Sequence, residues 1–281
     1  MTQKISIDKR NLWERIAGQG YLWLILFVLY APILLIIVFS LTKSKVFGNW
    51  TGFTFDLYRN LFTGYDMTAQ VRVDPNLYRA MLYTVIIAIV AAIISTLLGT
   101  VAAIGIFHMR QRHRKAVMFM NSIPMINPDI ITGISLFLLF VFIGINRGLG
   151  TVITAHVVFC TPYVILSVMP RLTKMNPNIY EAALDLGATP AQALRKVLIP
   201  ELWPGMISGF ILSLTLSIDD FGVTFFTKGS NGLETLSTFI YADARKGGLT
   251  PELRPLFSLI FLTILVLLII TNIRTNKQVK K

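Results

Sequence analysis

The chain has 281 residues, of which 54% are hydrophobic and only 14% charged, and its mean hydropathy is +0.65. This composition excludes a cytosolic globular enzyme, because it cannot be spread over a water-soluble surface. The 26 Lys and Arg exceed the 14 Asp and Glu to give a net charge of +12, which in a membrane protein reports on orientation instead of nucleic-acid binding.

Charge-poor apolar runs of membrane-spanning length recur along the chain. A hydrocarbon core of about 30 Å needs roughly 20 apolar residues in a helix. The third run is expected to bend at Pro124 and Pro128. We therefore expect an all-α membrane protein whose residues 1–281 form a single transmembrane domain. Six runs predict six transmembrane helices, at approximately 21–41, 81–107, 116–145, 151–169, 202–226 and 256–273.

The first run has the basic flank of a secretory signal, because Lys4, Lys9, Arg10 and Arg15 precede it. Its 21 residues are too many for the apolar part of a signal peptide, and no small-residue cleavage site follows it. We therefore interpret this run as an uncleaved first transmembrane helix.

Basic residues predict that both ends of the chain are cytoplasmic. With that orientation the inner segments 1–20, 108–115, 170–201 and 274–281 carry sixteen of the 26 Lys and Arg. The dense tract 110–115 lies in a short loop, where the positive-inside bias is strongest. The alternative for this tract is a patch that binds anionic lipid or nucleic acid.

The polar segment 174–200, between the fourth and fifth runs, predicts a cytoplasmic pair of short helices. Its residues include two helix caps followed by proline, a glycine where a helix stops, and a final proline that is expected to end the second helix. These are Asn176-Pro177, Thr189-Pro190, Gly187 and Pro200. The pair is either a hairpin lying in the membrane interface or a docking element for a cytoplasmic subunit.

Residue spacing within this pair is similar to that of a known family. Glu181-Ala182-Ala183, three residues, Gly187, nine residues, and then 197–200 resembles the EAA loop of type I ABC importer permeases. Val197 and Ile199 are conservative departures from Ile and Leu in that pattern. The resemblance implies that Glu181, Ala182, Ala183 and Gly187 contact a separate ATPase subunit and couple it to the membrane helices.

Residues for catalysis or for a resident cofactor are not found in the sequence. Cys160 is the only cysteine, and His108, His113 and His156 have no metal-site spacing. The sequence also has no G-x-x-x-x-G-K-[ST] phosphate loop. We therefore expect a chain that is not an enzyme and binds no metal or cofactor, with ATP and Mg bound by partner subunits.

Further stretches narrow the resemblance to the spermidine/putrescine importer permeases, in particular their C-type subunit. They are 49–53, 127–130, 216–221, 227–230 and 249–252. This resemblance implies a second, related permease, two cytoplasmic ATP-binding subunits, an extracytoplasmic polyamine-binding protein and a place in the bacterial cytoplasmic membrane. Lys228 departs from the family, because a neutral residue is expected there.

Three acids lie inside the predicted spans, where each costs about 2.5–3.5 kcal/mol. By helical rise Asp219 lies about 24 Å and Asp129 about 20 Å from the cytoplasmic side, so the two can meet at a similar depth. We predict that Asp129, Asp219 and Asp220 line a substrate pathway. The alternatives are that Asp219 and Asp220 cap a broken helix or pair with Lys228 or Arg147, and that Asp129 bonds backbone groups left free by Pro128.

Aromatic faces and carboxylates together suit a polyamine, which carries ammonium groups on an apolar chain. The candidate aromatic residues are Tyr30, Trp50, Phe221 and Phe225. The alternatives in function are the same architecture carrying another cationic or small organic solute, an intramembrane aspartyl protease, and a secondary cation transporter or channel. The protease alternative lacks its usual G-x-G-D context.

Overall fold

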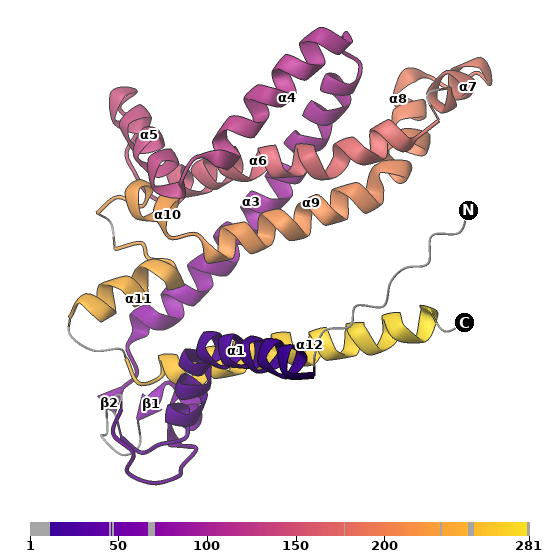
Figure 1. Ribbon diagram of the computed structural model, residues 1–281. Helices are drawn as coiled ribbons and strands as arrows, with labels where there is room; N and C mark the ends of the chain where they lie inside the picture. The colour runs from indigo at the N-terminus through magenta and orange to yellow at the C-terminus, as the bar shows by residue number, and fades with distance from the viewer. Residues whose placement is uncertain are drawn as a thin grey trace. The chain divides into compact units, whose positions relative to one another are not determined.

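The computed structural model is helical almost throughout and describes residues 12–44, 46, 48–66, 71–176, 178–230, 232–246 and 250–279 (Figure 1). Two compact units divide the chain: Met1–Asp74 with Asp243–Lys281, and Pro75–Ala242. Of the residues named as sequence signals, those outside the described part are Lys4, Lys9, Arg10, Pro177 and Leu249.

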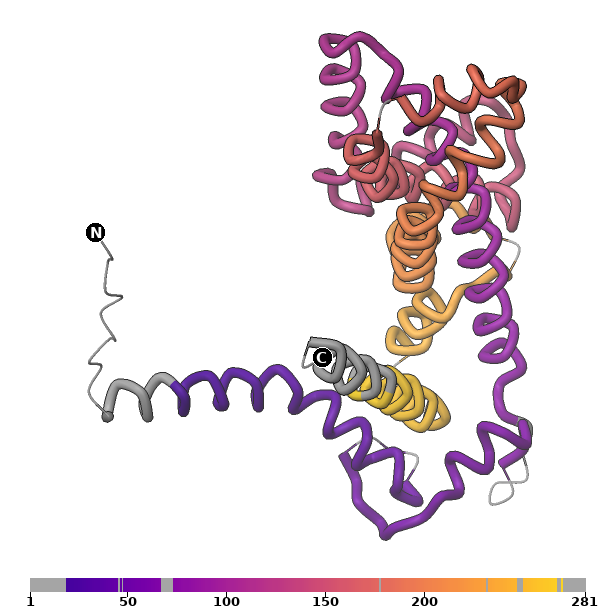
Figure 2. Tube along the Cα trace, turned by 90° about the vertical axis from the view of Figure 1, so that its right-hand side faces the viewer, coloured from indigo at the N-terminus to yellow at the C-terminus, as the bar shows by residue number. Residues whose placement is uncertain are grey.

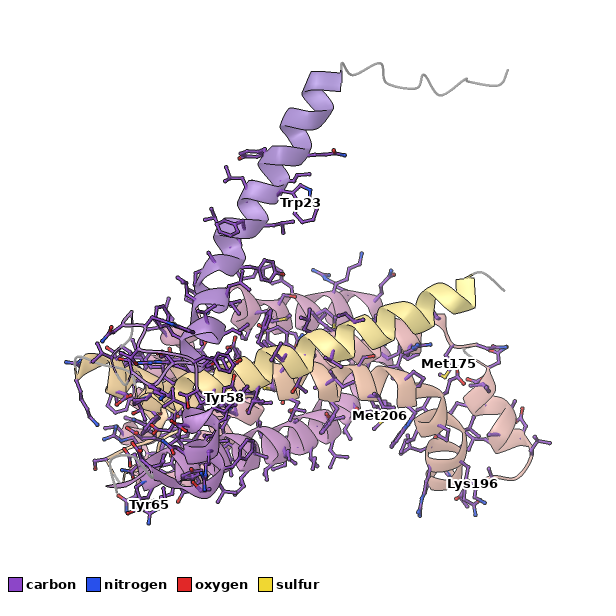
Figure 3. The ribbon with its side chains drawn as sticks, turned by 90° about the horizontal axis from the view of Figure 1, so that it is seen from below. Trp23, Tyr58, Tyr65, Met175, Lys196 and Met206 are labelled. Carbon is purple, nitrogen blue, oxygen red and sulfur yellow. The ribbon has the colours of Figure 1, made fainter. Side chains whose placement is uncertain are left out.

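In the first unit, helix α1 (Leu12–Ser40) packs against α12 (Leu253–Val279). The short helix α2 (Asp56–Thr63) joins them, because the Tyr58 hydroxyl lies 2.8 Å from Ser40 Oγ and donates to Ser258 Oγ at 3.0 Å. Strands β1 (Tyr65–Asp66) and β2 (Val71–Arg72) form a small antiparallel pair. Much of α1 is uncovered, as the 72% exposed Trp23 illustrates (Figure 3).

The second unit is built on α3, α6 and α9, which pack on one another, and its path can be followed in Figure 2. Glycines bring their backbones close: a Cβ on Gly99 of α3 would lie 2.6 Å from Val164 Cβ, and one on Gly209 of α9 would lie 3.3 Å from Val164 Cα. Small residues at such crossings are the usual means of packing helices in a membrane. The helices of this unit are α3 (Pro75–Phe107), α4 (Gln111–Ile126), α5 (Asp129–Phe142), α6 (Leu149–Lys174), α7 (Ile179–Asp185), α8 (Pro190–Ala193), the π-helix η1 (Leu194–Leu198), α9 (Ile199–Asp219), α10 (Gly222–Thr227) and α11 (Leu236–Arg245), whose last residues belong to the first unit.

Helix lengths agree with a chain that crosses a membrane several times. Four helical stretches are long and apolar enough, namely Gln19–Ser40, Pro75–Phe107, Leu149–Lys174 and Pro190–Asp219, and α4 with α5 can add a fifth. The apolar part of α12 that could be assessed, Leu253–Val266, is shorter. The all-α membrane class is confirmed, whereas the six spans and the orientation stay predictions.

Two of the predicted spans are not single straight helices. The 116–145 stretch divides into α4 and α5, which meet at an angle of 103°. Pro124 remains inside α4, and the break falls at Asn127 and Pro128, where both residues have extended backbone. A proline disfavours helical backbone in the residue before it, which explains why the chain turns here.

The 202–226 stretch also breaks, so the alternative of a broken helix capped by Asp220 is the one that the structure has. Helix α9 ends at Asp219, Asp220 has an extended backbone with φ −64° and ψ 131°, and α10 begins at Gly222. Hydropathy does not detect this interruption, because apolar residues continue on both sides of it. The break leaves backbone N–H and C=O groups without partners within a helix, so each needs a partner elsewhere.

Candidate functional site

At the break between α9 and α10, the buried carboxylate of Asp220 caps the start of α10. It accepts hydrogen bonds from the backbone N–H groups of Val223 at 3.1 Å and Thr224 at 2.8 Å, and from Thr224 Oγ1 at 2.8 Å. These bonds satisfy the first N–H groups of α10, as a helix cap does. Asp220 is only 5% exposed, so its carboxylate bonds to groups within the protein and does not line an open surface.

A histidine from another helix completes this arrangement. His156 of α6 is fully buried, with Nδ1 2.6 Å from Ser217 Oγ, Nε2 2.9 Å from Thr224 Oγ1, and Nε2 3.4 Å from Asp220 Oδ2. We call His156, Ser217, Asp220 and Thr224 the His156 network. It ties α6, α9 and α10 together. Sequence analysis missed His156, although a histidine inside an otherwise uncharged apolar run is a signal in itself.

Helix α5 crosses α10 at backbone contact and brings Asp129 to the break. A Cβ on Gly133 would lie 2.7 Å from the Gly222 carbonyl oxygen, and a Cβ on Gly222 would lie 3.3 Å from Asp129 Cβ. Asp129 therefore lies next to Gly222, two residues after Asp220. Asp129 and Asp219 are exposed, so two carboxylates remain accessible at a site where the third is buried.

Aromatic rings lie directly after these acids. The ring centroid of Phe221 lies 5.3 Å from that of Phe225 and 4.9 Å from that of Tyr241, and Phe225 lies 5.7 Å from Tyr241. We call these three residues the aromatic cluster. Tyr241 was not predicted, because only tertiary packing brings α11 to these rings. A 2.7 Å hydrogen bond from Leu236 N–H to Thr84 Oγ1 holds α11 on α3.

The other predicted residues lie elsewhere. Tyr30 on α1 and Trp50 in the loop after α1 belong to the first unit, where they are 47% and 49% exposed. Lys228 contacts Glu234, with 3.3 Å between Nζ and Oε1, and the Arg147 guanidinium lies 4.7 Å from the centroid of the Phe137 ring. In the part of the chain that the structure describes, the side chain that contacts the Asp220 carboxylate from another helix is His156, whereas Lys228 and Arg147 make the contacts above.

The helix pair in 174–200 forms the hairpin that the sequence predicts. Helix α7 ends before Gly187, which has a φ of +87°, and Thr189 then begins α8. Thr189 Oγ1 accepts from Gln192 N–H at 3.3 Å, while Gln192 Oε1 accepts from Thr189 N–H at 3.1 Å. This reciprocal pair is a capping box, so the predictions at Gly187 and Thr189 are confirmed.

Two boundaries of the hairpin differ from the prediction. Helix α7 begins at Ile179, and Asn176 instead accepts a 3.0 Å bond from Asn178 N–H before the helix starts. Pro200 does not end the second helix, because η1 precedes it with a wide turn in which Ile199 N–H bonds to Leu194 C=O. Pro200 has no N–H group to donate, and the wide turn of η1 leaves room for its ring. The chain therefore continues as helix from Pro190 to Asp219.

The tip of the hairpin exposes residues that this chain does not cover. Glu181 and Ala182 are exposed, Ala183 is half-buried, and Leu186 is 89% exposed. The leucines of the hairpin differ in environment, because Leu198 is buried whereas Leu186 is exposed. Lys196, labelled in Figure 3, also lies on the outer surface of this region.

The fold and these two sites define a multi-pass helical membrane protein with acids at a helix break and an exposed hairpin at one end of a continuous helix. The family model described as binding-protein-dependent transport system inner membrane component matches residues 95–276. The chain belongs to this family. It is thus a transport permease subunit and not an enzyme, which removes the aspartyl protease and secondary transporter alternatives.

Named relatives cover most of the chain. The spermidine/putrescine transport system permease protein PotC of Haemophilus influenzae is 34% identical over 92% of this chain and 96% of its own length. PotC of Escherichia coli K12 is 32% identical over 95% and 96%. The putrescine transport system permease protein PotI of the same strain is 36% identical over 83% and 81%.

Solved structures share the fold. A bacterial ABC transporter involved in the import of the acidic polysaccharide alginate contains a chain that superposes with a TM-score of 0.65, covering 96% of this chain and 99% of its own at 16% identity. The MetNI methionine ABC transporter in an inward-facing conformation gives a TM-score of 0.53, covering 70% and 92% at 24% identity. Both resemblances concern the fold.

Proposed function

We propose that this chain is a permease subunit of an ABC importer that carries the polyamines spermidine and putrescine across the bacterial cytoplasmic membrane. The observation that carries the proposal is the pair of exposed carboxylates, Asp129 and Asp219, beside the aromatic cluster. The relatives named for spermidine and putrescine transport support the same cargo. In this proposal the chain crosses the membrane six times with both ends in the cytoplasm.

The acids and rings suit a cargo with several ammonium groups on an apolar chain. Two accessible carboxylates near one helix break attract cations and repel anions such as sulfate. An aromatic face holds an ammonium group with about 0.5–2 kcal/mol, depending on how far water is excluded. The proposed pathway therefore offers charge at Asp129 and Asp219 and cation–π contact at Phe221.

The hairpin is proposed to receive the movement of an ATPase subunit. Glu181, Ala182, Ala183 and Gly187 would form the contact, and Glu181, Ala182 and Gly187 are exposed and so accessible to a partner. Helical backbone continues over 30 residues from Pro190 to Asp219, through α8, the π turn of η1 and the long helix α9. A displacement of the hairpin is then carried along one helix to the acid at its other end.

The proposed assembly has a second, related permease, two ATP-binding subunits that hold ATP and Mg, and an external polyamine-binding protein. Reconstitution of this assembly in lipid vesicles tests it. We expect uptake of labelled putrescine and spermidine that depends on ATP and on the binding protein. An intact assembly that hydrolyses ATP and moves no polyamine would refute the cargo, and competition on the binding protein would then identify another cationic or small organic solute.

A further inference from the structure

We propose that Phe225 and Glu234 form an ammonium-binding subsite, that the chain's own Lys228 fills it, and that this makes the permease favour a diamine over a longer triamine. The inference rests on the proposed function, because it concerns how many ammonium groups of a polyamine the pathway accepts. It also accounts for a lysine at a position where the sequence resemblance leads us to expect a neutral residue.

Lys228 is held as a bound ammonium ion would be. Its Nζ lies 3.3 Å from Glu234 Oε1 and 5.8 Å from the centroid of the Phe225 ring. The side chains of Lys228 and Glu234 are only 17% and 28% exposed, so most of this pair is covered by the protein. A carboxylate on one side and an aromatic face on the other are the groups that recognise an ammonium ligand.

The backbone fixes the lysine at this place. Lys228 N–H donates to Thr224 C=O at 2.9 Å at the end of α10, and Thr224 itself belongs to the His156 network. The backbone position of Lys228 is therefore set by the same turn of helix that Asp220 caps.

The subsite is continuous with the proposed pathway. The Phe225 ring that faces Lys228 also contacts the rings of Phe221 and Tyr241, and Phe221 comes two residues after Asp219. Phe225 and Tyr241 are 37% and 41% exposed, so the aromatic cluster is open to a ligand. A row of groups thus runs from the accessible acids across the rings to Lys228.

Cargo length decides whether this lysine matters. A diamine can place its ammonium groups on the acids and the first ring without approaching Lys228. A triamine carries a further ammonium group along the row, where it meets a cation of the same sign and a carboxylate that is already paired. Lys228 therefore disfavours the triamine relative to the diamine in two ways, because it repels the third ammonium group and because it already occupies Glu234. Repulsion of the unwanted ligand is a common route to specificity.

Competitive uptake of labelled spermidine and putrescine by the reconstituted assembly, with one binding protein throughout, tests the subsite. Lys228→Ala should raise the spermidine-to-putrescine uptake ratio by about three- to thirtyfold, the range that a cation–π contact and a partly exposed ion pair provide. Adding Glu234→Ala should abolish that gain, because the freed carboxylate is then missing. Arg147→Gln is the matched control, since it removes a cation that lies on another ring.

Each outcome bears on the subsite. An unchanged ratio in Lys228→Ala with retained uptake overturns it, and so does a gain that persists in the double variant or appears equally in Arg147→Gln. A wild-type assembly that moves neither polyamine overturns the proposed cargo, and the subsite with it, and is recognised before any variant is measured. If Lys228→Ala fails to assemble, Lys228→Gln, which keeps much of the side-chain length, should give a smaller gain in the same direction.

Discussion

Replacing His156 with leucine tests whether the buried network holds α10 in place. Leucine fills a similar volume but removes both ring nitrogens, and with them the contacts to Ser217 at 2.6 Å, Thr224 at 2.9 Å and Asp220 at 3.4 Å. Polar contacts between membrane helices contribute about 0.6 kcal/mol each on average and up to about 1.7. Loss of three contacts should therefore cost about 2–4 kcal/mol of folding free energy, because Asp220 also keeps a buried charge without its histidine.

Denaturant titration of the purified assembly measures this loss. We expect His156→Leu to unfold at a lower denaturant concentration, and His156→Gln, which retains one donor and one acceptor, to lie between it and the wild type. His113→Leu is the matched control, since His113 is exposed at the start of α4 and should shift stability by less than about 0.5 kcal/mol. Equal stability of His156→Leu and His113→Leu would refute the reasoning.

Glycine positions give two further predictions. Gly133→Ala places a methyl group 2.7 Å from the Gly222 carbonyl oxygen, so α5 must move away from α10 at a cost of about 1–3 kcal/mol of folding free energy. Polyamine uptake should therefore fall. Gly150→Ala is the control, because its methyl group meets no atom within 4 Å and should leave uptake unchanged. Gly187→Val forces a β-branched residue to a φ of +87°, which strains the turn of the hairpin. If the hairpin couples the ATPase to transport, ATP hydrolysis should then lose its stimulation by the binding protein. Uptake at the wild-type rate would count against the coupling role.

Hydropathy and cap chemistry were sufficient for most helices, because bilayer thickness sets helix length and local residues set helix ends. Gly187 and Thr189 lie where the sequence predicts, since both act on their own turn of the chain. Pro200 does not follow the local rule, because the π turn of η1 accommodates it and the helix continues. Signals that depend on the neighbouring turn are therefore less certain than signals contained within one turn.

The break at Asp220 was not predictable from local sequence as more than an alternative. Its bonding partner, His156, lies 64 positions earlier in the chain, and their contact exists only once α6 and α9 have packed. The acids themselves were found because a carboxylate in an apolar run is costly and needs a reason. Which of the two adjacent acids is exposed depends on tertiary packing, since neighbouring helical positions differ by about 100° and either can face inward.

The two adjacent acids provide the sharpest test of this division of roles, because one substitution can be made at both. Asp219 is exposed at the end of α9, whereas Asp220 accepts three hydrogen bonds and contacts His156. Asp219→Asn should leave the stability of the assembly within about 0.5 kcal/mol and lower polyamine uptake. Asp220→Asn replaces one acceptor oxygen with a donor that faces N–H and O–H groups, so it should lower stability by about 1–3 kcal/mol before uptake is considered. Equal stability of the two variants in denaturant titration would mean that the break is not held by Asp220.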